Sequence, residues 1–341
     1  MPQTRRESQV RSPALTLAGA LLIVGLTILA FAGGRLFGRV EQPTPVASTV
    51  VAAPPAVVDE PLPTPEVAVA AVAPVELTPI PLPSYFARAP IVCLDPGHGG
   101  SDRGFSRFFD DGAPYMEEAP LVLQQAFDLK TRLEHRGYQV ILTRDTDAAV
   151  NIDGRDVNGD GRTAAHDPPR SDRNKNLDEI QARINICNAA NADLLVSMHL
   201  NGFSNGTPRG PEAWFTRERQ FGDENAAFAT LAYEHLKEQL TKIGYEIPVE
   251  ERGVNPDSAA DVQKEYAVFQ HFIITGPEIP GVVVPSKMPG AIVEALFVSN
   301  DWDASVLETD AGRNAIINAY ENSIVEYFEW YPPGVSSTPV N

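Results

Sequence analysis

The sequence predicts an α/β fold: a single three-layer domain in which a mostly parallel, twisted sheet is flanked by helices. Short apolar segments typical of buried strands alternate along the chain with longer segments of helical periodicity. Several strand segments end in polar residues, as parallel strands do at the edge where α/β sheets bind ligands. The chain of 341 residues is long enough for one such domain with further segments. We expect a transmembrane helix and a disordered linker to precede the domain.

The N-terminal region has the composition of a membrane segment. Residues 14–34 contain no charged side chain, and a run of about 20 apolar residues can cross a bilayer as a helix. Arginines precede the run, which agrees with a short cytoplasmic segment over 1–13. A cleavable signal peptide is the alternative, with Ala30-Phe31-Ala32 as the cleavage site. We therefore expect a signal anchor over 14–34 and a single-pass protein of the cell membrane with an extracytoplasmic body, secreted if the segment is cleaved.

A proline-rich linker follows over residues 35–87. Eleven of the thirty prolines lie between Pro43 and Pro83, and no helical or strand period survives there. Such a composition favours extended polyproline II structure and a semi-rigid spacer. We expect the catalytic domain over 88–331 and a short tail over 332–341.

The strands and helices of the domain alternate. The helix that begins near Leu121 has Pro120 in its first turn and Gly137 at the position that follows a helix end. A later helix carries His235, which we expect to be exposed. We predict strands over 91–94, 138–143, 193–197 and 290–297, and helices from 121, around 180–187 and over 224–243.

Charge and cysteine content exclude some functions and leave one question open. The formal net charge is −18, which argues against nucleic acid as a partner because phosphate-backbone binders need a basic face. Cys93 lies in a strand segment and Cys187 in a helical one, and both are interpreted as small buried apolar residues. A disulfide between them remains open, since sequence does not give their separation in space.

Histidines follow two of the predicted strands. His98 lies in the turn Asp-Pro-Gly-His-Gly-Gly after the first strand, and His199 follows the strand over 193–197. Glu117 and Glu118 lie where the first helix begins. Two histidines, one glutamate and an open fourth position are a catalytic zinc pattern. Each residue also has an ordinary interpretation, as a turn histidine or as a favourable charge in a first helical turn.

Glu294 lies within the apolar strand Gly290–Phe297. A buried carboxylate without a partner is costly, so this residue needs a partner or a chemical role. A salt bridge to a buried arginine is the alternative to a catalytic role.

Four motifs in order resemble one enzyme family. The segments are IVCLDPGHGGSDRG, EAPLVLQQAFDLKTRLEHRGYQVILTRDTD, QARINICNAANADLLVSMHLN and PGAIVEALFVSN. Together they resemble the zinc-dependent N-acetylmuramoyl-L-alanine amidases of type 3. The resemblance implies that His98, Glu118 and His199 bind zinc, and that Glu294 is the catalytic base. Glu118 is preferred over Glu117 because its distance to Gly137 matches the family's usual interval.

The resemblance also implies the reaction and the partner. The substrate would be peptidoglycan, cut at the amide between the lactyl group of N-acetylmuramic acid and the L-alanine of the stem peptide. A zinc peptidase acting on stem peptides and a non-catalytic wall-binding protein remain the alternatives. Neither an activator protein nor the oligomeric state follows from the sequence.

Two insertions depart from the family pattern. The segment between Asp147 and Leu177 places carboxylates and amides at positions of an EF-hand-like loop. A polar surface loop is the favoured interpretation, and calcium as a second ion is the alternative. His166 in this loop is expected to be solvated. The segment 256–287 is interpreted as an extra hairpin at the domain edge, with a cleft wall or a lid as alternatives. The predicted calcium ligands are Asp156, Asn158, Asp160 and Asp167, with Gly161 at the sharp turn.

Overall fold

The computed structural model describes residues 80–169, 171–259 and 270–333. The predicted membrane segment over 14–34 and most of the linker lie outside these ranges. Within them, no helix combines the length and the apolar character that a membrane span needs.

Six strands form the central sheet, in the order β4-β1-β5-β8-β6-β7. Strands β4, β1, β5 and β8 run parallel to one another, whereas β6 is antiparallel to β8 and β7 is parallel to β6. The mostly parallel sheet predicted from sequence is confirmed. The strands are β1 (Ile91–Pro96), β4 (Gln139–Leu142), β5 (Leu194–Asn201), β6 (Glu212–Phe215), β7 (Gly253–Pro256) and β8 (Gly290–Phe297).

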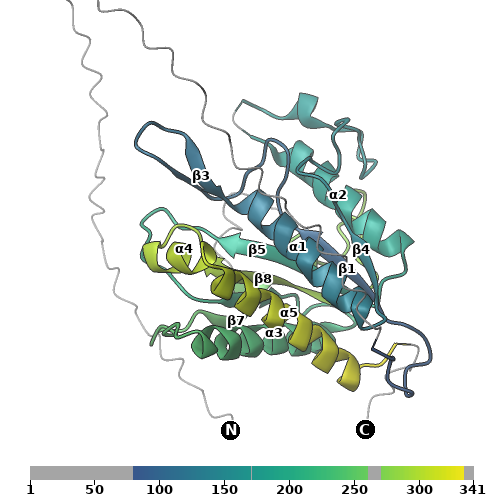
Figure 1. The fold of residues 1–341 in the computed structure, drawn as a ribbon. Coiled ribbons are helices and arrows are strands. Elements are labelled where there is room, and N and C mark those ends of the chain that lie inside the picture. Colours follow the sequence, from purple (N-terminus) through teal and green to yellow (C-terminus); the bar gives the residue numbers. More distant parts are fainter. Residues whose placement is uncertain (1–79, 170, 260–269, 334–341) are drawn as a thin grey trace, which may run out of the picture. The chain divides into compact units, whose positions relative to one another are not determined.

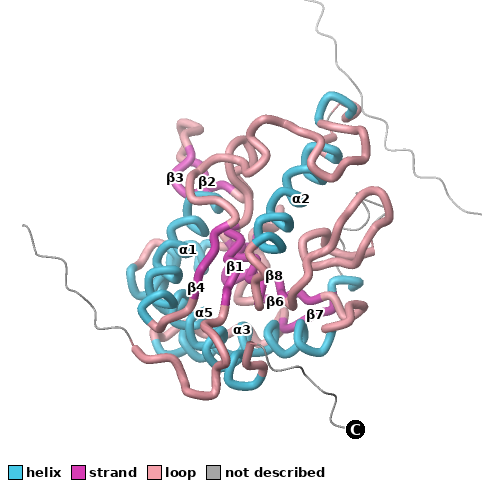
Figure 2. Tube along the Cα trace, turned by 90° about the vertical axis from the view of Figure 1, so that its right-hand side faces the viewer, coloured by secondary structure: helices cyan, strands magenta, loops and turns pink. Residues whose placement is uncertain are grey.

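Helices cover both faces of the sheet, so the domain has three layers (Figure 1). Figure 2 shows α1 and α5 on one side of the sheet and α2 on the other. Alternate strand residues face the two sides: Leu94 and Val196 belong to the core under α1, α3 and α5, whereas Cys93 and Leu195 belong to the core under α2. The helices are α1 (Glu118–His135), α2 (Arg173–Ala189), α3 (Gly222–Lys242), α4 (Asp301–Leu307) and α5 (Asp310–Trp330).

Shorter elements complete the described chain. A small hairpin, β2 (Ser106–Phe108) with β3 (Pro114–Glu117), leads directly into α1. Two 3₁₀ turns, η1 (Ala164–His166) and η2 (Asp257–Ala259), lie in the two insertions.

Each predicted strand and helix is present, but several ends differ: α1 begins at Glu118 rather than at 121, and β1 continues to Pro96. The hairpin β2–β3, strands β6 and β7, and helices α4 and α5 were not predicted. Strand β8 has the predicted bounds, and Gly137 follows the end of α1 with a φ of 80°, the left-handed conformation expected after a helix. Strand β5 continues to Asn201, so His199 lies within the strand rather than after it. The apolar stretch alone placed the end of β5 too early, because the polar residues His199 and Asn201 still pair with β8.

Two predictions about side chains need correction. Cys93 and Cys187 are fully buried, as expected, but they form a disulfide with Cα atoms 5.6 Å apart, so the interpretation as mere apolar residues is wrong. This bond ties β1 to α2. His235 is not exposed: its side chain keeps 18% of its accessible surface, and Nε2 lies 2.8 Å from Glu326 of α5. His166 is exposed, as predicted.

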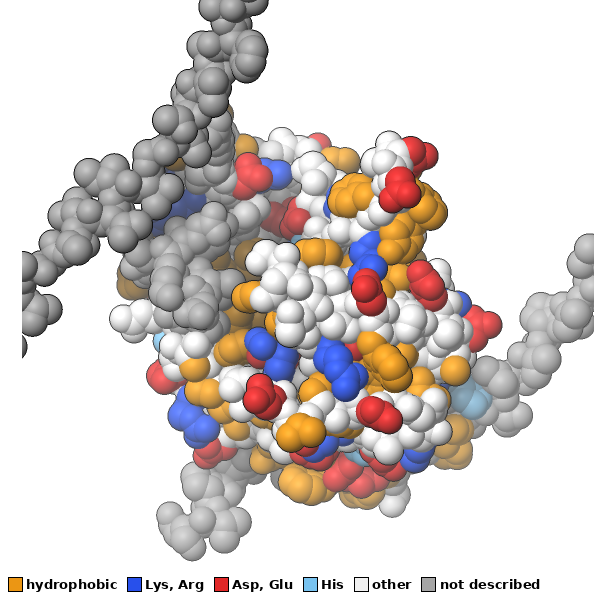
Figure 3. Space-filling model, turned by 90° about the vertical axis from the view of Figure 1, so that its left-hand side faces the viewer, with side chains coloured by type: hydrophobic (Ala, Val, Ile, Leu, Met, Phe, Trp, Pro, Cys, Tyr) orange, Lys and Arg blue, Asp and Glu red, His pale blue; other side chains and the backbone are white. Residues whose placement is uncertain are grey.

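Charges of both signs are mixed on one face of the molecule. Figure 3 shows acidic, basic and hydrophobic side chains interspersed on this face. No broad basic area stands out on the visible part of it, which agrees with the net charge of −18.

Candidate metal centre

His98 is held in an unusual backbone conformation at the end of β1. Its φ is 60°, in the left-handed region that non-glycine residues rarely adopt. Two arginines from the neighbouring elements hold this turn through its carbonyl oxygens. Arg144 donates to the carbonyls of Pro96 and Gly97, and Arg183 of α2 donates to those of Pro96 and His98. The surrounding structure thus fixes a conformation that the sequence alone would not favour.

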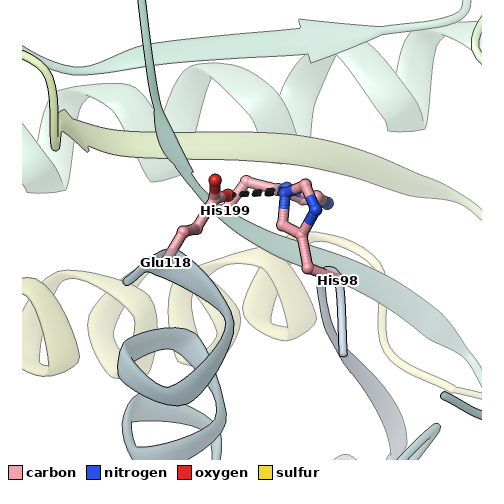
Figure 4. A group of neighbouring side chains, drawn as sticks. All are labelled: His98, Glu118 and His199. Atoms are coloured by element: carbon pink, nitrogen blue, oxygen red, sulfur yellow. Dashed lines mark hydrogen bonds and ion pairs between the residues drawn. The ribbon is translucent and has the colours of Figure 1, made fainter. Parts of the chain in front are cut away.

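Two imidazoles and one carboxylate meet at the C-terminal edge of the sheet (Figure 4). Oε1 of Glu118 lies 3.0 Å from Nε2 of His98 and 3.0 Å from Nδ1 of His199. The two rings are 4.9 Å apart between centroids. Glu118 is the first residue of α1, whereas Glu117 lies outside the group and pairs with Arg103. The structure therefore brings together the three residues that the sequence predicted, and it selects Glu118.

Backbone groups orient the Glu118 carboxylate. Its Oε1 accepts a hydrogen bond from the amide of Leu200, and its Oε2 accepts one from the amide of Phe105, both at 3.0 Å. Burial by itself would raise the pKa of Glu118, but hydrogen bonds to the two histidines hold the pKa well below its usual range. The carboxylate is therefore ionised and preorganised, as a metal ligand must be.

A further carboxylate orients the His98 ring. Asp102 lies 2.9 Å from Nδ1, and its other oxygen accepts from the amide of Gly104. Burial lowers the pKa of His98, but the bonds to Asp102 and Glu118 outweigh it and raise the pKa to about 10. A histidine that ligates a metal through one nitrogen usually has such a carboxylate on the other.

Two glycines leave the space that the histidine and the glutamate occupy. A Cβ at Gly97 would lie 2.1 Å from Cε1 of His199, and a Cβ at Gly104 would lie 2.3 Å from Oε2 of Glu118. Real side-chain atoms do not approach so closely, so any larger residue would displace the group.

Glu294 lies beside this centre on the adjacent strand. It is the register partner of His199 in the parallel pair β5–β8, and of Glu212 in the antiparallel pair β6–β8. Its Oε2 is buried and has no hydrogen-bond partner within the described residues. Burial raises the pKa of Glu294 to about 7. A carboxylate in this state can both accept and donate a proton near neutral pH.

Three of the four predicted site residues line a common cavity. A cavity of about 370 Å³ is lined by His98, His199 and Glu294, together with residues of α2 and of the segment 271–274. Glu118, the first residue of α1, is not among the residues that line this cavity. The segment 256–287 therefore lines the cleft with Asp257 and His271, and its interpretation as a hairpin at the domain edge is wrong for the described part. Residues 260–269 lie outside the described ranges.

Comparison with protein families matches residues 92–326 to the N-acetylmuramoyl-L-alanine amidase family. The chain belongs to this family. It is 23% identical over 238 residues to the germination-specific N-acetylmuramoyl-L-alanine amidase of Bacillus subtilis, covering 70% of this chain and 79% of that protein. It is 25% identical over 256 residues to the amidase AmiA of Salmonella typhimurium, covering 71% and 77% of the two chains.

A solved structure with a similar arrangement is that of the CwlD amidase from Clostridioides difficile in complex with the GerS lipoprotein. The sequence identity is 21%, the coverage is 71% of this chain and 99% of that one, and the TM-score is 0.49. Family membership makes the chain a hydrolase of peptidoglycan amides and confirms the activity predicted from the four motifs.

Sequence reasoning missed the buried ion pairs that support the amidase centre. Asp95 is buried and accepts hydrogen bonds from Thr143, Arg183 and Ser197. Burial would raise the pKa of Asp95, but the charge of Arg183 holds it below its usual range. The aspartate of the Asp-Pro-Gly-His turn was visible in the sequence, whereas its arginine partner on α2, 88 residues away, was not.

Glu212 is a second missed residue, across the sheet from Glu294. It accepts two hydrogen bonds from Arg252, at 2.7 and 3.0 Å, and one from Asn201 at 2.8 Å. Burial raises the pKa of Glu212 despite these partners. Arg252 pairs with Glu212, and Oε2 of Glu294 has no partner among the described residues, which disfavours the salt-bridge interpretation of Glu294.

The predicted calcium ligands lie along one loop but do not form a single group. Asp156 accepts from the amides of Gly159 and Gly161, whereas Asp167 accepts from the first amides of α2. In the described part of the chain, three carboxylates of this loop do not lie within 4.8 Å of one another. Calcium binding stays a prediction. Asn158 and Asp160 accept from the amides of Asp160 and Arg162.

Proposed function

We propose that the amidase is zinc-dependent and cleaves the amide between the lactyl group of N-acetylmuramic acid and L-alanine. The observation that carries the proposal is the placement of Glu294 beside His199, in a cavity that His98 also lines. His98, Glu118 and His199 would hold the ion. Two imidazole nitrogens and one carboxylate oxygen are a ligand set that fits zinc. The contact of Asp102 with Nδ1 of His98 also supports zinc, because ligating histidines usually have such a carboxylate on the other ring nitrogen.

The chemistry follows from the positions of these groups. Bound zinc supplies a Lewis acid that polarises the scissile carbonyl and acidifies a water molecule. Glu294 accepts the proton of the attacking water and delivers it to the leaving amine nitrogen. Burial suits this role because a pKa of about 7 lets the carboxyl group hold the proton between the two steps. Arg144 and Arg183 keep the His98 turn in place throughout.

The test combines metal analysis with product identification on purified peptidoglycan. Glu294→Gln is expected to keep one zinc and to lose at least about 10²-fold in rate, the usual contribution of a general base. His199→Ala is expected to lose both zinc and activity. His235→Ala serves as the matched control, because this histidine contacts Glu326 of α5 and does not line the cavity. Undiminished hydrolysis by Glu294→Gln would remove its role as the base.

Mass spectrometry of the products separates the alternative functions. A zinc peptidase would cut within the stem peptide and leave L-alanine on the glycan. A wall-binding protein without activity would release no product. The presence of all four functional residues in one place argues against the second alternative.

We also propose that the amidase is anchored in the cell membrane with its catalytic domain outside the cytoplasm. The uncharged run over 14–34 and the prolines after it support an anchor and a spacer. The Cys93–Cys187 disulfide supports an oxidising compartment. Membrane fractionation with N-terminal sequencing tests this, and a mature chain that begins after Ala32 would show a secreted protein instead.

A calcium site in the loop 156–167 is a further part of the proposal. Asp178 of α2 is buried behind the loop and accepts from the amide of Val157 at 2.8 Å. Burial, and then the charges of Asp156 and Asp160, raise the pKa of Asp178. A divalent cation would relieve this repulsion. Calcium titration by calorimetry should detect binding near about 10⁻⁴–10⁻³ M, and Asp160→Asn should abolish it. Absence of both heat and a melting shift would refute the site.

A further inference from the structure

Lys175 places an ammonium group in the wall of the cavity. It lies in the first turn of α2, keeps 39% of its side-chain surface accessible and lines the cavity together with Ser101. Its Nζ donates a hydrogen bond to Oγ of Ser101 at 3.0 Å. The backbone of Lys175 is fixed as well, since its amide donates to Asp167 at 3.1 Å.

The serine that this ammonium group contacts lies in the turn that follows His98. Ser101 belongs to the turn between Gly99 and Asp102, which two backbone hydrogen bonds of 2.8 and 3.2 Å close. Asp102, the next residue, contacts the His98 ring. Lys175 lines the same cavity as His98, His199 and Glu294, so one molecule in the cavity can contact these groups together.

The nearby charges leave this lysine suited to an anion. An ammonium group has three donors, of which the bond to Ser101 uses one, and the serine hydroxyl is itself a donor. Asp172 lies 3.7 Å from Nζ, but its side chain is 67% exposed, and exposed pairs of this kind contribute little. Lysine and serine donors can thus converge on one carboxylate.

Apolar side chains line part of the same cavity. Leu177 and Ile180 of α2 face the cavity from the same side as Lys175, and Ile274 and Ile292 line it as well. Arg173 and Arg183 line this cavity too, and Arg183 pairs with Asp95 and Glu179. Apolar side chains beside a lysine fit a short peptide that carries a carboxylate, because the peptide buries its apolar groups and its charge finds donors.

We propose that Lys175 and Ser101 bind the α-carboxylate of the second residue of the stem peptide. The inference rests on the proposed function, which places the scissile nitrogen at the metal centre and the stem peptide on its leaving side. One residue spans about 3.8 Å between Cα atoms, so a free carboxylate on the second residue follows closely behind the bond that is cut. Lys175 is then a determinant of specificity for this carboxylate.

The experiment compares two muropeptides that differ only at this group. One carries a free α-carboxylate on the second stem residue, and the other carries the neutral carboxamide. The zinc-loaded full chain is expected to prefer the carboxylate form by about tenfold or more in kcat/KM, as for a charge-assisted hydrogen bond. Lys175→Met should remove the preference, because KM rises more for the carboxylate form than for the carboxamide form.

Lys242→Met is the matched control, because this lysine pairs with Glu238 at the end of α3 and does not line the cavity. Its preference should equal that of the unmodified chain. Equal losses on both muropeptides in Lys175→Met, or no preference in the unmodified chain, would overturn the assignment.

A binding measurement keeps this test independent of the reaction. Calorimetry with the zinc-loaded Glu294→Gln chain compares the two intact muropeptides without turnover, again with and without Lys175→Met. Hydrolysis of neither muropeptide by the unmodified chain would refute the proposed function, yet the binding difference would still decide whether Lys175 recognises the carboxylate.

Discussion

Breaking the Cys93–Cys187 disulfide should strongly destabilise the amidase without removing any residue of the metal centre. The bond joins residues 94 positions apart and links β1 to α2 within the core under α2. In the chain-entropy model a cross-link that closes a loop of about 100 residues contributes about 4.7 kcal/mol. Total stabilities of domains are about 5–15 kcal/mol, so the reduced protein should be close to its folding threshold.

The assay is urea unfolding of the oxidised chain, the reduced chain and three variants. Cys93→Ala, Cys187→Ala and the double variant should lose similar amounts, because each removes the same cross-link, and none should respond to reductant. The melting temperature should fall by about 10 °C or more, at about 2–4 °C per kcal/mol for a domain of this size. An unchanged midpoint in reductant, with both thiols shown to be free, would refute the reasoning.

Four further predictions concern the metal centre and helix α5. Gly97→Ala should lose zinc, because its Cβ would lie 2.1 Å from the His199 ring; zinc titration beside a melting curve checks this, and full zinc content would contradict it. The apparent zinc affinity should rise between about pH 6 and 9, because His98, with a pKa raised from 6.5 to about 10, must lose its proton to bind. In the metal-free chain the same proton stabilises folding fully below pH 6.5, and its contribution is lost as pH rises towards 10, so melting temperatures of metal-free samples should fall over that window. Thr309→Ala should cost about 1 kcal/mol, since its hydroxyl accepts from the amide of Gly312 at the start of α5; an unaltered urea midpoint would count against it.

The metal centre shows how far local sequence patterns reach. His98 and His199 could be found because each lies near the end of an apolar strand, and parallel strands bring their carboxyl ends to one edge. Glu118 required the family's spacing as well, because Glu117 next to it fits the helix start equally. The structure separates the two, since Glu117 turns outwards to Arg103 and Glu118 turns inwards to the histidines.

The sequence by itself determined the alternation of strands and helices, the family, and the four residues of the proposed reaction, because these depend on short-range periodicity and on ordered motifs. Only the tertiary structure decided the partners of those residues. The bond between Cys93 and Cys187, the pair of Asp95 and Arg183, and the turn that brings Lys175 to Ser101 each join segments far apart in the chain. Contacts of this kind depend on how the helices pack on the sheet, and no local sequence pattern encodes which distant segments will meet.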